Sequence, residues 1–335
     1  MSMASVLVTG GAGYVGSHTC KLLAARGILP VSFDSLVKGH REMVSWGPLV
    51  VGDIRDKAAI RKAIADHQAE AVFHFAALAY VGESVERPDA YYDVNVAGTM
   101  ALLAAMREMS VTKLIFSSSC ATYGIPDRVP IDENEPQRPI NPYGRTKLIG
   151  EQMLSEHGKA FGLRHAILRY FNAAGCDVEG RLVEKHDPEP HLIPRALMAA
   201  AGFGPPLQIH GTDYDTPDGT AIRDYVHVDD LAAAHYQALD RLSYAPGAIV
   251  LNIGTGRGYS VRQVIDMVER VTGREVPFTE GPRRPGDPPV LIAATERAAD
   301  MLDFTPQYSD LETIVRTAWR GIQSVCRVPP ERPAL

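Results

Sequence analysis

A glycine-rich turn near the start of the chain most constrains the fold. It joins a short apolar segment, residues 5–8, to a helix predicted over 17–26, and it carries Gly10, Gly13 and Gly16. Glycine permits a tight turn, a close backbone approach to a pyrophosphate and close packing of helix on strand, while the helix N-terminus attracts an anion. The first two glycines are spaced more widely than in the usual G-x-G-x-x-G pattern. Three glycines can also form an ordinary turn, but the strand–turn–helix context predicts a dinucleotide site.

Strands and helices alternate after this turn. The predicted strands cover residues 30–33, 49–53, 71–75, 113–117 and 164–170, and the predicted helices cover 56–66, 88–109 and a segment that begins at Pro142. Alternation of this kind produces right-handed βαβ units, and hence a parallel sheet with helices on both faces. The sequence therefore predicts an α/β fold with a doubly wound, Rossmann-type parallel sheet.

The alternation weakens after Asn172, where prolines and glycines become frequent. We expect residues 1–172 to form the Rossmann domain and residues 173–335 to form mainly a smaller α/β C-terminal substrate-binding lobe. A strand over 249–252 and a helix over 261–271 fall in a stretch near 229–272 that we expect to return to the main sheet.

Composition excludes several classes of protein. The 335 residues are 45% hydrophobic and 22% charged, which argues against disorder. The net charge is −6 and no run of Lys or Arg occurs, so we expect neither a nucleic-acid partner nor a membrane surface. No apolar stretch reaches the roughly 18–20 residues of a membrane span, and the N-terminus has no signal pattern. The four cysteines are scattered without a metal-binding spacing, so we expect reduced thiols, no metal and a cytoplasmic location.

Two acidic residues follow predicted strands at the edge where a dinucleotide binds. Asp34 ends the second strand about twenty residues after the glycines, where an acid accepts hydrogen bonds from the adenosine ribose. A carboxylate there repels a 2′-phosphate, so NAD is favoured over NADP. Asp53 follows the third strand, and it either contacts the adenine amine or caps the next helix.

A Tyr-x-x-x-Lys pair begins the helix that starts at Pro142. Asn141 is a suitable N-cap and Pro142 a suitable first-turn residue, and Tyr143 and Lys147 then share one helix face. The cation is expected to lower the pKa of the phenol towards neutrality, which makes Tyr143 a candidate general acid/base. Ser117, Ser118 and Ser119 end the fifth strand, where a hydroxyl can share a proton with Tyr143. Each feature alone also fits a solvated helix or a common turn.

Taken together in this order, the glycine motif, the acid, the serine and the Tyr–Lys pair resemble the extended short-chain dehydrogenase/reductase superfamily. Further segments resemble the UDP-glucose 4-epimerase family within it, namely Thr9 to His18, Val81-Gly82-Glu83-Ser84, Asn95-Val96-x-Gly98-Thr99, Tyr170-Phe171-Asn172, Asp218 to Val228 and Arg284-Pro285-Gly286-Asp287. The similarity spans nearly the whole chain.

The resemblance implies a role for each matching residue. The catalytic residues it implies are Tyr143 as acid/base, Lys147 as the neighbour that lowers its pKa, and Ser119 as the bridging hydroxyl. The NAD site it implies consists of Gly10, Gly13, Tyr14, Val15, Gly16, Asp34, Asp53, Ile54, Phe75, Ala76, Ala77, Asn95, Ser117, Lys147 and Tyr170. The UDP-sugar site it implies consists of Ser119, Tyr143, Asn172, His191, Leu192, Gln208, His210, Arg223, Arg284 and Asp287. Arginine forks suit a diphosphate, although ion pairs of Arg223 and Arg284 with Asp224 and Asp287 are the alternative.

The activity implied is interconversion of UDP-galactose and UDP-glucose through a 4-keto intermediate, with transient hydride transfer to bound NAD. A homodimer built from the helices near 88–109 and 142–161 is implied as well. The chain departs from better-known members at Ala79-Tyr80, at His191 and at Leu291, a position that controls room for a 2-acetamido group. UDP-xylose, UDP-arabinose, UDP-N-acetylhexosamines and UDP-uronic acids therefore remain alternative substrates. A 4,6-dehydratase is disfavoured, because Ser119-Cys120-Ala121-Thr122 lacks the expected acid pair. A non-catalytic NAD-binding sensor is disfavoured by the intact catalytic set.

Overall fold

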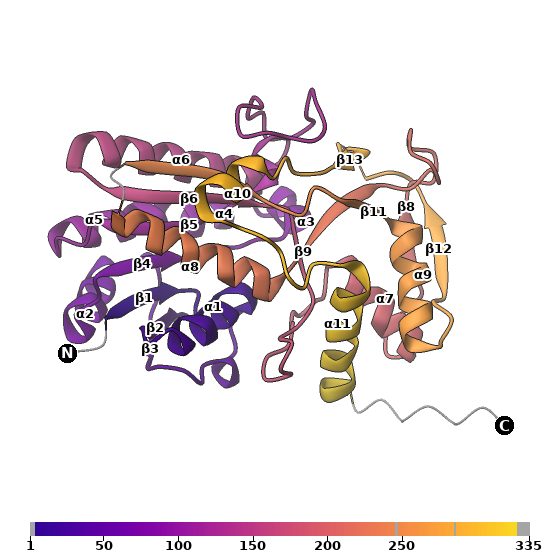
Figure 1. Cartoon of the computed structure of the whole chain (residues 1–335), viewed down its shortest axis with the longest axis horizontal. Coiled ribbons are helices and arrows are strands. Elements are labelled where there is room, and N and C mark those ends of the chain that lie inside the picture. Colours follow the sequence, from indigo (N-terminus) through magenta and orange to yellow (C-terminus); the bar gives the residue numbers. More distant parts are fainter. Residues whose placement is uncertain (1–3, 245–246, 285, 327–335) are drawn as a thin grey trace.

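The computed structural model describes residues 4–244, 247–284 and 286–326, and these form two lobes (Figure 1). Pro285 of the predicted Arg284–Asp287 motif, and the outermost parts of both predicted domains at 1–3 and 327–335, lie outside the described residues.

The larger lobe is built on a seven-stranded parallel sheet with the strand order β10-β6-β5-β4-β1-β2-β3. Its strands are β1 (Ser5–Thr9), β2 (Leu29–Asp34), β3 (Leu49–Val51), β4 (Ala71–His74), β5 (Lys113–Ser119), β6 (Arg164–Tyr170) and β10 (Ala248–Ile253). The predicted doubly wound fold is confirmed. The order reverses between β1 and β4, and ligands of such sheets bind at the carboxyl ends of the strands at this point.

Helices cover both faces of the sheet because successive strand residues point to opposite sides. Val8 of β1 faces one core and Leu7 faces the other, and both are fully buried. The first face carries α1 (Tyr14–Ala25), α8 (Val228–Tyr244) and α10 (Glu296–Leu302). The second face carries α2 (Lys57–His67), α5 (Gly98–Glu108) and α6 (Pro142–Phe161).

The helix predicted over 88–109 is one continuous helical stretch, but the type of helix changes along it. It consists of α4 (Pro88–Tyr91), a π-helical segment η2 (Tyr92–Ala97) and α5, and a short unpredicted helix, α3 (Val81–Glu86), precedes it. The boundary lies at Arg87 because the residue before a proline is disfavoured in helical conformation. Short π-helical segments often occur at functional sites, and this one contains Asn95.

The smaller lobe packs three helices against short strands. The helices are α7 (Leu192–Ala201), α9 (Val261–Thr272) and α11 (Leu311–Cys326), and the strands are β7 (Asn172–Ala174), β8 (Leu207–His210), β9 (Ile222–His227), β11 (Gly258–Ser260), β12 (Phe278–Gly281) and β13 (Val290–Leu291). The short 3₁₀ turns η1 (Arg41–Met43) and η3 (Cys120–Thr122) lie in loops of the larger lobe.

The chain passes back into the larger lobe after β9. α8 packs on α1, and β10 pairs with β6 as the outermost strand of the sheet. The helix expected over 261–271, observed as α9, lies in the smaller lobe instead. Its buried residues Val264, Ile265 and Val268 belong to the apolar cluster shared with α7 and α11.

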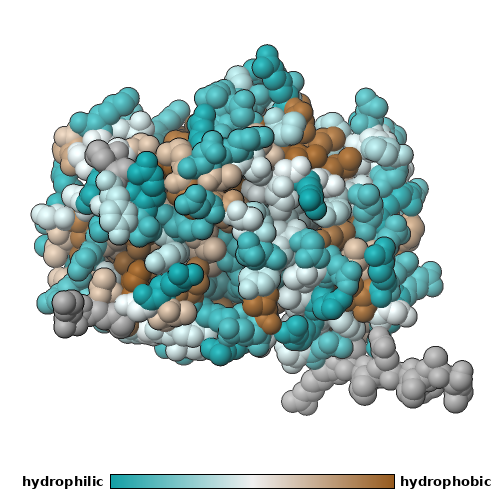
Figure 2. All heavy atoms as spheres, in the orientation of Figure 1, coloured by the Kyte–Doolittle hydropathy of each residue, from teal (hydrophilic) through white to brown (hydrophobic). Residues whose placement is uncertain are grey.

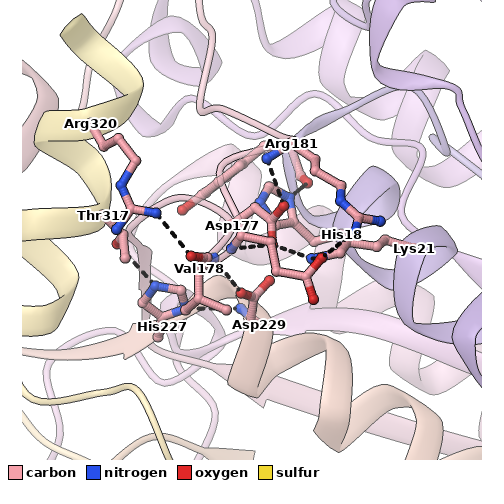
Figure 3. A network of polar contacts seen from close by, with 11 residues as sticks. His18, Lys21, Asp177, Val178, Arg181, His227, Asp229, Thr317 and Arg320 are labelled. Carbon is pink, nitrogen blue, oxygen red and sulfur yellow. Dashed lines mark hydrogen bonds and ion pairs between the residues drawn. The ribbon is translucent and has the colours of Figure 1, made fainter. Parts of the chain in front are cut away.

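A polar network joins the two lobes (Figure 3). Lys21 of α1 pairs with the fully buried carboxylate of Asp177 in the segment after β7. Asp229, in the first turn of α8, accepts a hydrogen bond from the Val178 amide at 3.0 Å. From the smaller lobe, Arg320 of α11 donates to the Val178 carbonyl at 2.9 Å. The segment that begins at Gly175 is thereby fixed to α1, α8 and α11.

A buried ion pair holds α6 against the sheet. Arg169 of β6 donates its Nε to both oxygens of Glu151 on α6, at 3.0 and 3.1 Å, and its Nη2 to Oε2 at 2.6 Å. Their side chains are 7% and 5% exposed. Ser118 of β5 also donates to Glu151. One carboxylate therefore connects α6 to two adjacent strands.

We predict that Glu151→Ala destabilises the protein by about 3–5 kcal/mol, because it leaves the Arg169 guanidinium buried without its partner. Asp127→Ala is the control. It breaks the exposed pair between Asp127 and Arg138 and is expected to cost less than about 1 kcal/mol. Urea unfolding followed by circular dichroism measures both. Equal losses in the two variants would contradict the role given to Glu151.

Candidate active site

The three glycines of the first turn serve different purposes. Gly10 has φ +74°, and a Cβ there would lie 2.6 Å from the Ala76 amide nitrogen. A Cβ on Gly16 would lie 2.2 Å from the Gly10 carbonyl oxygen. Both residues therefore permit close packing within the protein. A Cβ on Gly13 would meet only the Gly10 oxygen, at 3.2 Å, so space remains beside Gly13 for a ligand.

The N-terminus of α1 is left open for an anion. Gly13 is its N-cap and offers no side-chain hydrogen bond, and the first turn contains no acidic residue. Tyr14 begins the helix and its hydroxyl bonds to the Gly175 carbonyl, while Val15 packs against the apolar cluster on the α1 face of the sheet. Free backbone amides at a helix N-terminus suit a phosphate.

Asp34 lies beside the glycine turn. Its oxygens accept hydrogen bonds from the amides of Ala12 at 3.0 Å and Leu36 at 2.8 Å. Burial raises the pKa of this carboxyl, and the two amides oppose that shift. Each oxygen keeps a lone pair for a further donor, as a ribose contact requires. The nearby Lys38 points elsewhere and bonds to the Asp187 carbonyl at 3.2 Å.

Asp53 is held by the neighbouring Arg55. The Arg55 amide and Nε donate to its Oδ1 at 2.8 and 2.9 Å. Asp53 does not cap α2, because the N-cap is Asp56, so this alternative is wrong. The next residue, Ile54, is buried against α5, where a Cβ on Gly98 would come within 2.7 Å of it.

The loop after β4 is fixed from two directions. The amides of Phe75 and Ala76 donate to the Thr9 carbonyl, at 2.9 and 3.0 Å. Asn95 both donates to and accepts from the backbone of Leu78, at 3.0 and 2.8 Å, and it donates to Thr146 of α6 at 3.0 Å. The Asn95 side chain thus makes three hydrogen bonds to two residues, Leu78 and Thr146, so it positions the stretch that contains Ala77 beside α6.

Tyr143, Lys147 and Ser119 come together where α6 meets the end of β5. Asn141 caps α6 by accepting from the Gly144 amide at 2.8 Å, as expected. The Lys147 ammonium lies 5.9 Å from the centre of the Tyr143 ring and donates to the Ser117 carbonyl at 2.8 Å. The Ser119 hydroxyl, at the end of β5, lies close enough to the Tyr143 phenol to lower its pKa. The Ser117 hydroxyl pairs with that of Tyr170.

The pKa of Tyr143 is not lowered as the sequence predicted. Burial raises it, the Tyr170 phenol raises it further, and only the Ser119 hydroxyl opposes this. Burial likewise lowers the pKa of Lys147 to about 8, with Glu151 opposing that shift. In this environment desolvation outweighs the attraction between the two groups. A Lys147 pKa of about 8 still leaves most of its ammonium groups charged at pH 7.

Basic side chains of the smaller lobe gather near the ends of β8, β9 and β12. Arg223 of β9 pairs with Asp287 and donates to the Ile222 carbonyl at 2.7 Å. Asp224 instead accepts from Thr255 and Gly256. Partial desolvation lowers the pKa of Arg284, Asp287 opposes this shift, and the charges of Arg195 and Arg223 add to it. This concentration of positive charge suits a diphosphate.

The remaining predicted substrate residues surround this cluster. Gln208 and His210 alternate with the buried Leu207 and Ile209 along β8, so they share its other face. Desolvation, then Arg284 and Arg195, lowers the pKa of His210. Asn172 begins β7 and is paired with Tyr225 of β9.

His191 and Leu192 stand at the start of α7, but they differ in surroundings. Leu192 packs against the core of the smaller lobe. The His191 ring faces Glu184 and Glu189, and not the arginines. The His191 side chain contacts these two carboxylates while it remains 43% exposed.

Sequence reasoning missed two side chains of the site. Arg195 lies on α7, one turn after His191, and it acts electrostatically on both Arg284 and His210. In the sequence, only the position of Arg195 four residues after His191 pointed to it. Tyr91 lies against Tyr143, with ring centres 6.5 Å apart, and its hydroxyl holds the backbone of Tyr80. No local pattern pointed to Tyr91.

Comparisons with known proteins agree with this arrangement. The NAD dependent epimerase/dehydratase family matches residues 6–254. The UDP-glucose 4-epimerase of Rhizobium meliloti is 51% identical over 315 residues, which cover 94% of this chain and 96% of the relative. A crystal structure of UDP-glucose 4-epimerase from Brucella ovis in complex with NAD is 56% identical, with a TM-score of 0.93 and coverage of 95% and 98%. The enzyme of Stenotrophomonas maltophila, solved with NAD and formylated UDP-arabinopyranose, is 40% identical, with a TM-score of 0.94 and coverage of 98% and 100%.

We predict that Gly13→Ala and Gly16→Ala fail in different ways. Gly13 has φ −86°, which alanine adopts, so Gly13→Ala should fold with a stability change below about 1 kcal/mol but lose at least about tenfold in dinucleotide affinity. Gly16→Ala should lower the melting temperature, because its Cβ meets backbone. Differential scanning calorimetry and the NAD content of the purified variants measure both. Unchanged NAD affinity in Gly13→Ala would contradict the proposal that the ligand binds beside Gly13.

Proposed function

The chain belongs to the NAD-dependent epimerase/dehydratase family, and on this basis we propose that it interconverts UDP-galactose and UDP-glucose by inversion at C4. The arrangement of three side chains supports this proposal most directly. Tyr143, Lys147 and Ser119 meet at the end of β5, on the edge of the sheet where the glycine turn also lies. Near-full-length similarity to UDP-glucose 4-epimerases supports the same activity.

The residues of the larger lobe fit NAD. The space beside Gly13 and the open N-terminus of α1 fit the pyrophosphate, and Asp34 fits the adenosine ribose. The loop after β4 contains Phe75, Ala76 and Ala77, and it continues along the predicted NAD site. When bound there, NAD supplies the hydride acceptor and donor for C4.

Tyr143 is proposed to move the proton of the sugar 4-hydroxyl. As phenolate it takes this proton, and as phenol it returns a proton to the 4-oxygen when hydride comes back to the opposite face of C4. Lys147, charged at neutral pH, favours the phenolate by its proximity. The Ser119 hydroxyl acts on the phenol and lowers its pKa, and it is proposed to keep the phenol oxygen in place. Because the pKa of Tyr143 is raised, the negative charge of its phenolate has to be stabilised by the groups that surround the phenolate when NAD and the UDP-sugar are bound.

The basic cluster of the smaller lobe is proposed to hold UDP. Arg223 and Arg284 offer planar forks for the two phosphates, and Arg195 adds a third cation nearby. Binding energy from UDP keeps the substrate in place while the sugar turns to present its other face. Few contacts to the sugar itself are needed, which suits inversion.

Leu291 is proposed to limit the sugar. It lies on β13 and packs against the cluster that contains Cys120, the residue after Ser119, together with Tyr123 and Phe171. A large apolar residue there leaves little room for a 2-acetamido group, so UDP-hexoses are favoured over UDP-N-acetylhexosamines. A UDP-pentose 4-epimerase is the second candidate, because the similar Stenotrophomonas maltophila protein was solved with a UDP-arabinopyranose derivative.

A cytoplasmic homodimer remains part of the proposal. α5 and α6 expose Met100 and Phe161, 58% and 51% accessible, as a two-helix interface would require. A monomer in analytical ultracentrifugation would refute the dimer.

Cys20, Cys120, Cys176 and Cys326 are free thiols, which agrees with a reducing compartment. Among the described residues, no helix has both the length and the apolar character needed to cross a bilayer.

The test is chromatography of the products formed from UDP-galactose, UDP-N-acetylgalactosamine and UDP-xylose, without added NAD. We expect conversion of UDP-galactose to UDP-glucose as the fastest reaction. Tyr143→Phe should lower kcat about 100- to 10,000-fold, because it removes the acid/base, and should retain NAD.

Tyr123→Phe is the control for loss of a buried phenol. Its hydroxyl bonds to Asn252 and Arg169, so its loss should affect stability more than turnover. Full activity in Tyr143→Phe would contradict the assigned role. No conversion of any sugar, with NAD supplied, would contradict the function.

A further inference from the structure

Four side chains of one short segment converge outside the proposed active site. Glu184, His186, Glu189 and His191 each offer one nitrogen or oxygen atom, and these atoms all lie within 4.8 Å of one another. The segment follows the polar network that joins the lobes and leads directly into α7. The cysteine spacing had indicated no metal site, and this set contains no cysteine.

The distances within the set are close to those between ligands of a single metal ion. His191 Nδ1 lies 2.8 Å from Glu189 Oε1 and 3.0 Å from Glu184 Oε1. His186 Nδ1 lies 3.2 Å from Glu189 Oε2 and 3.4 Å from Glu184 Oε1. A tetrahedral ion with ligands at about 2.0–2.2 Å places neighbouring ligand atoms about 3.3–3.6 Å apart. His186 therefore stands at about metal-ligand spacing from both carboxylates, and His191 stands closer to them, with its 2.8 Å contact to Glu189 also a hydrogen bond.

Glu184 provides an independent indication of a cation. Its side chain is 3% exposed, and neither of its oxygens makes a properly oriented hydrogen bond to a described residue. The 3.0 Å contact with His191 lacks hydrogen-bond alignment. A carboxylate removed from water without oriented donors is costly unless a cation compensates. Both oxygens are available to such a cation.

The surroundings would hold these ligands in place. The His186 ring packs edge-on against Tyr14 and Tyr80, each 5.9 Å away between ring centres. The His191 amide donates to Glu189 Oε1 at 2.9 Å. Preceding residues of the same segment are anchored by Asp177 and Asp229 (Figure 3). Orientation by neighbouring groups is characteristic of metal sites.

We propose that Glu184, His186, Glu189 and His191 bind one divalent transition-metal ion, with Zn²⁺ as the best match to two imidazoles and two carboxylates. Imidazole ligands favour zinc, copper, iron and nickel over magnesium and calcium. The ion fixes the segment 184–191 between Tyr14, in the predicted cofactor site, and α7. The His191 side chain then serves the metal, which explains why it does not face the arginine cluster.

The competing account is a set of ion pairs without metal. In that account the two carboxylates hold both histidines by hydrogen bonds and ion pairs. Both accounts use the same atoms, but they differ in proton balance. Zn²⁺ must displace protons from the histidines, so metal binding should release protons, as measured by calorimetry in buffers of different ionisation enthalpy.

The test uses full-length protein without a histidine tag, stripped with EDTA and dialysed. Zn²⁺ is titrated in competition with a chromophoric chelator, and thermal unfolding is followed with and without the ion. We expect one Zn²⁺ per chain, release of protons and a higher melting temperature. His186→Asn and Glu189→Gln should each weaken binding at least about tenfold, since even indirect partners of a metal site matter that much.

His67→Asn is the control, because His67 ends α2 and lies outside the cluster. It should bind Zn²⁺ as the unaltered protein does. Absence of stoichiometric binding, or equal binding by all variants, would overturn the proposal. If neither cluster variant folds, Co²⁺ decides the matter in the unaltered protein: visible bands of tetrahedral cobalt support the site, and an octahedral spectrum or none refutes it.

Discussion

The buried ion pair between Arg169 and Glu151 is the interaction on which the catalytic arrangement depends. Each residue that it involves is a neighbour of a proposed site residue. Glu151 lies one helical turn after Lys147 on α6, Arg169 precedes Tyr170 on β6, and Ser118, which donates to Glu151, stands between Ser117 and Ser119 on β5. The carboxylate also opposes the loss of charge on Lys147. One buried contact therefore sets both the geometry and the electrostatics of the site, at the stability cost that desolvated charges require.

Local patterns predicted the larger lobe well because its elements are defined by short-range physics. The strand–turn–helix at Gly10–Gly16, the alternation of strands and helices, and the cap at Asn141 all follow from neighbouring residues. The smaller lobe was less predictable. α9 has a clear helical pattern, but only tertiary packing decides that its apolar face covers α7 and α11, and not the main sheet.

Features that depend on distant residues could not be predicted from the sequence. Arg195, Arg223 and Arg284 are far apart in the chain, and their mutual influence arises only when α7, β9 and the segment after β12 meet. The sign of the Tyr143 pKa shift was wrong for a related reason. Sequence shows the cation four residues away but not the burial, and burial dominates. The Glu184–His191 cluster is local, yet its convergence depends on a segment held by both lobes.

The central claim is that this site inverts C4 of a UDP-sugar by removing and returning the same hydrogen. The most direct measurement is the fate of deuterium placed at C4 of UDP-galactose, followed by NMR and mass spectrometry of the UDP-glucose formed in ordinary water. We expect the deuterium to remain at C4 of the product, because the hydrogen leaves and returns within a closed site. Replacement of the deuterium by solvent hydrogen would contradict it, since inversion would then proceed by loss of a proton to water.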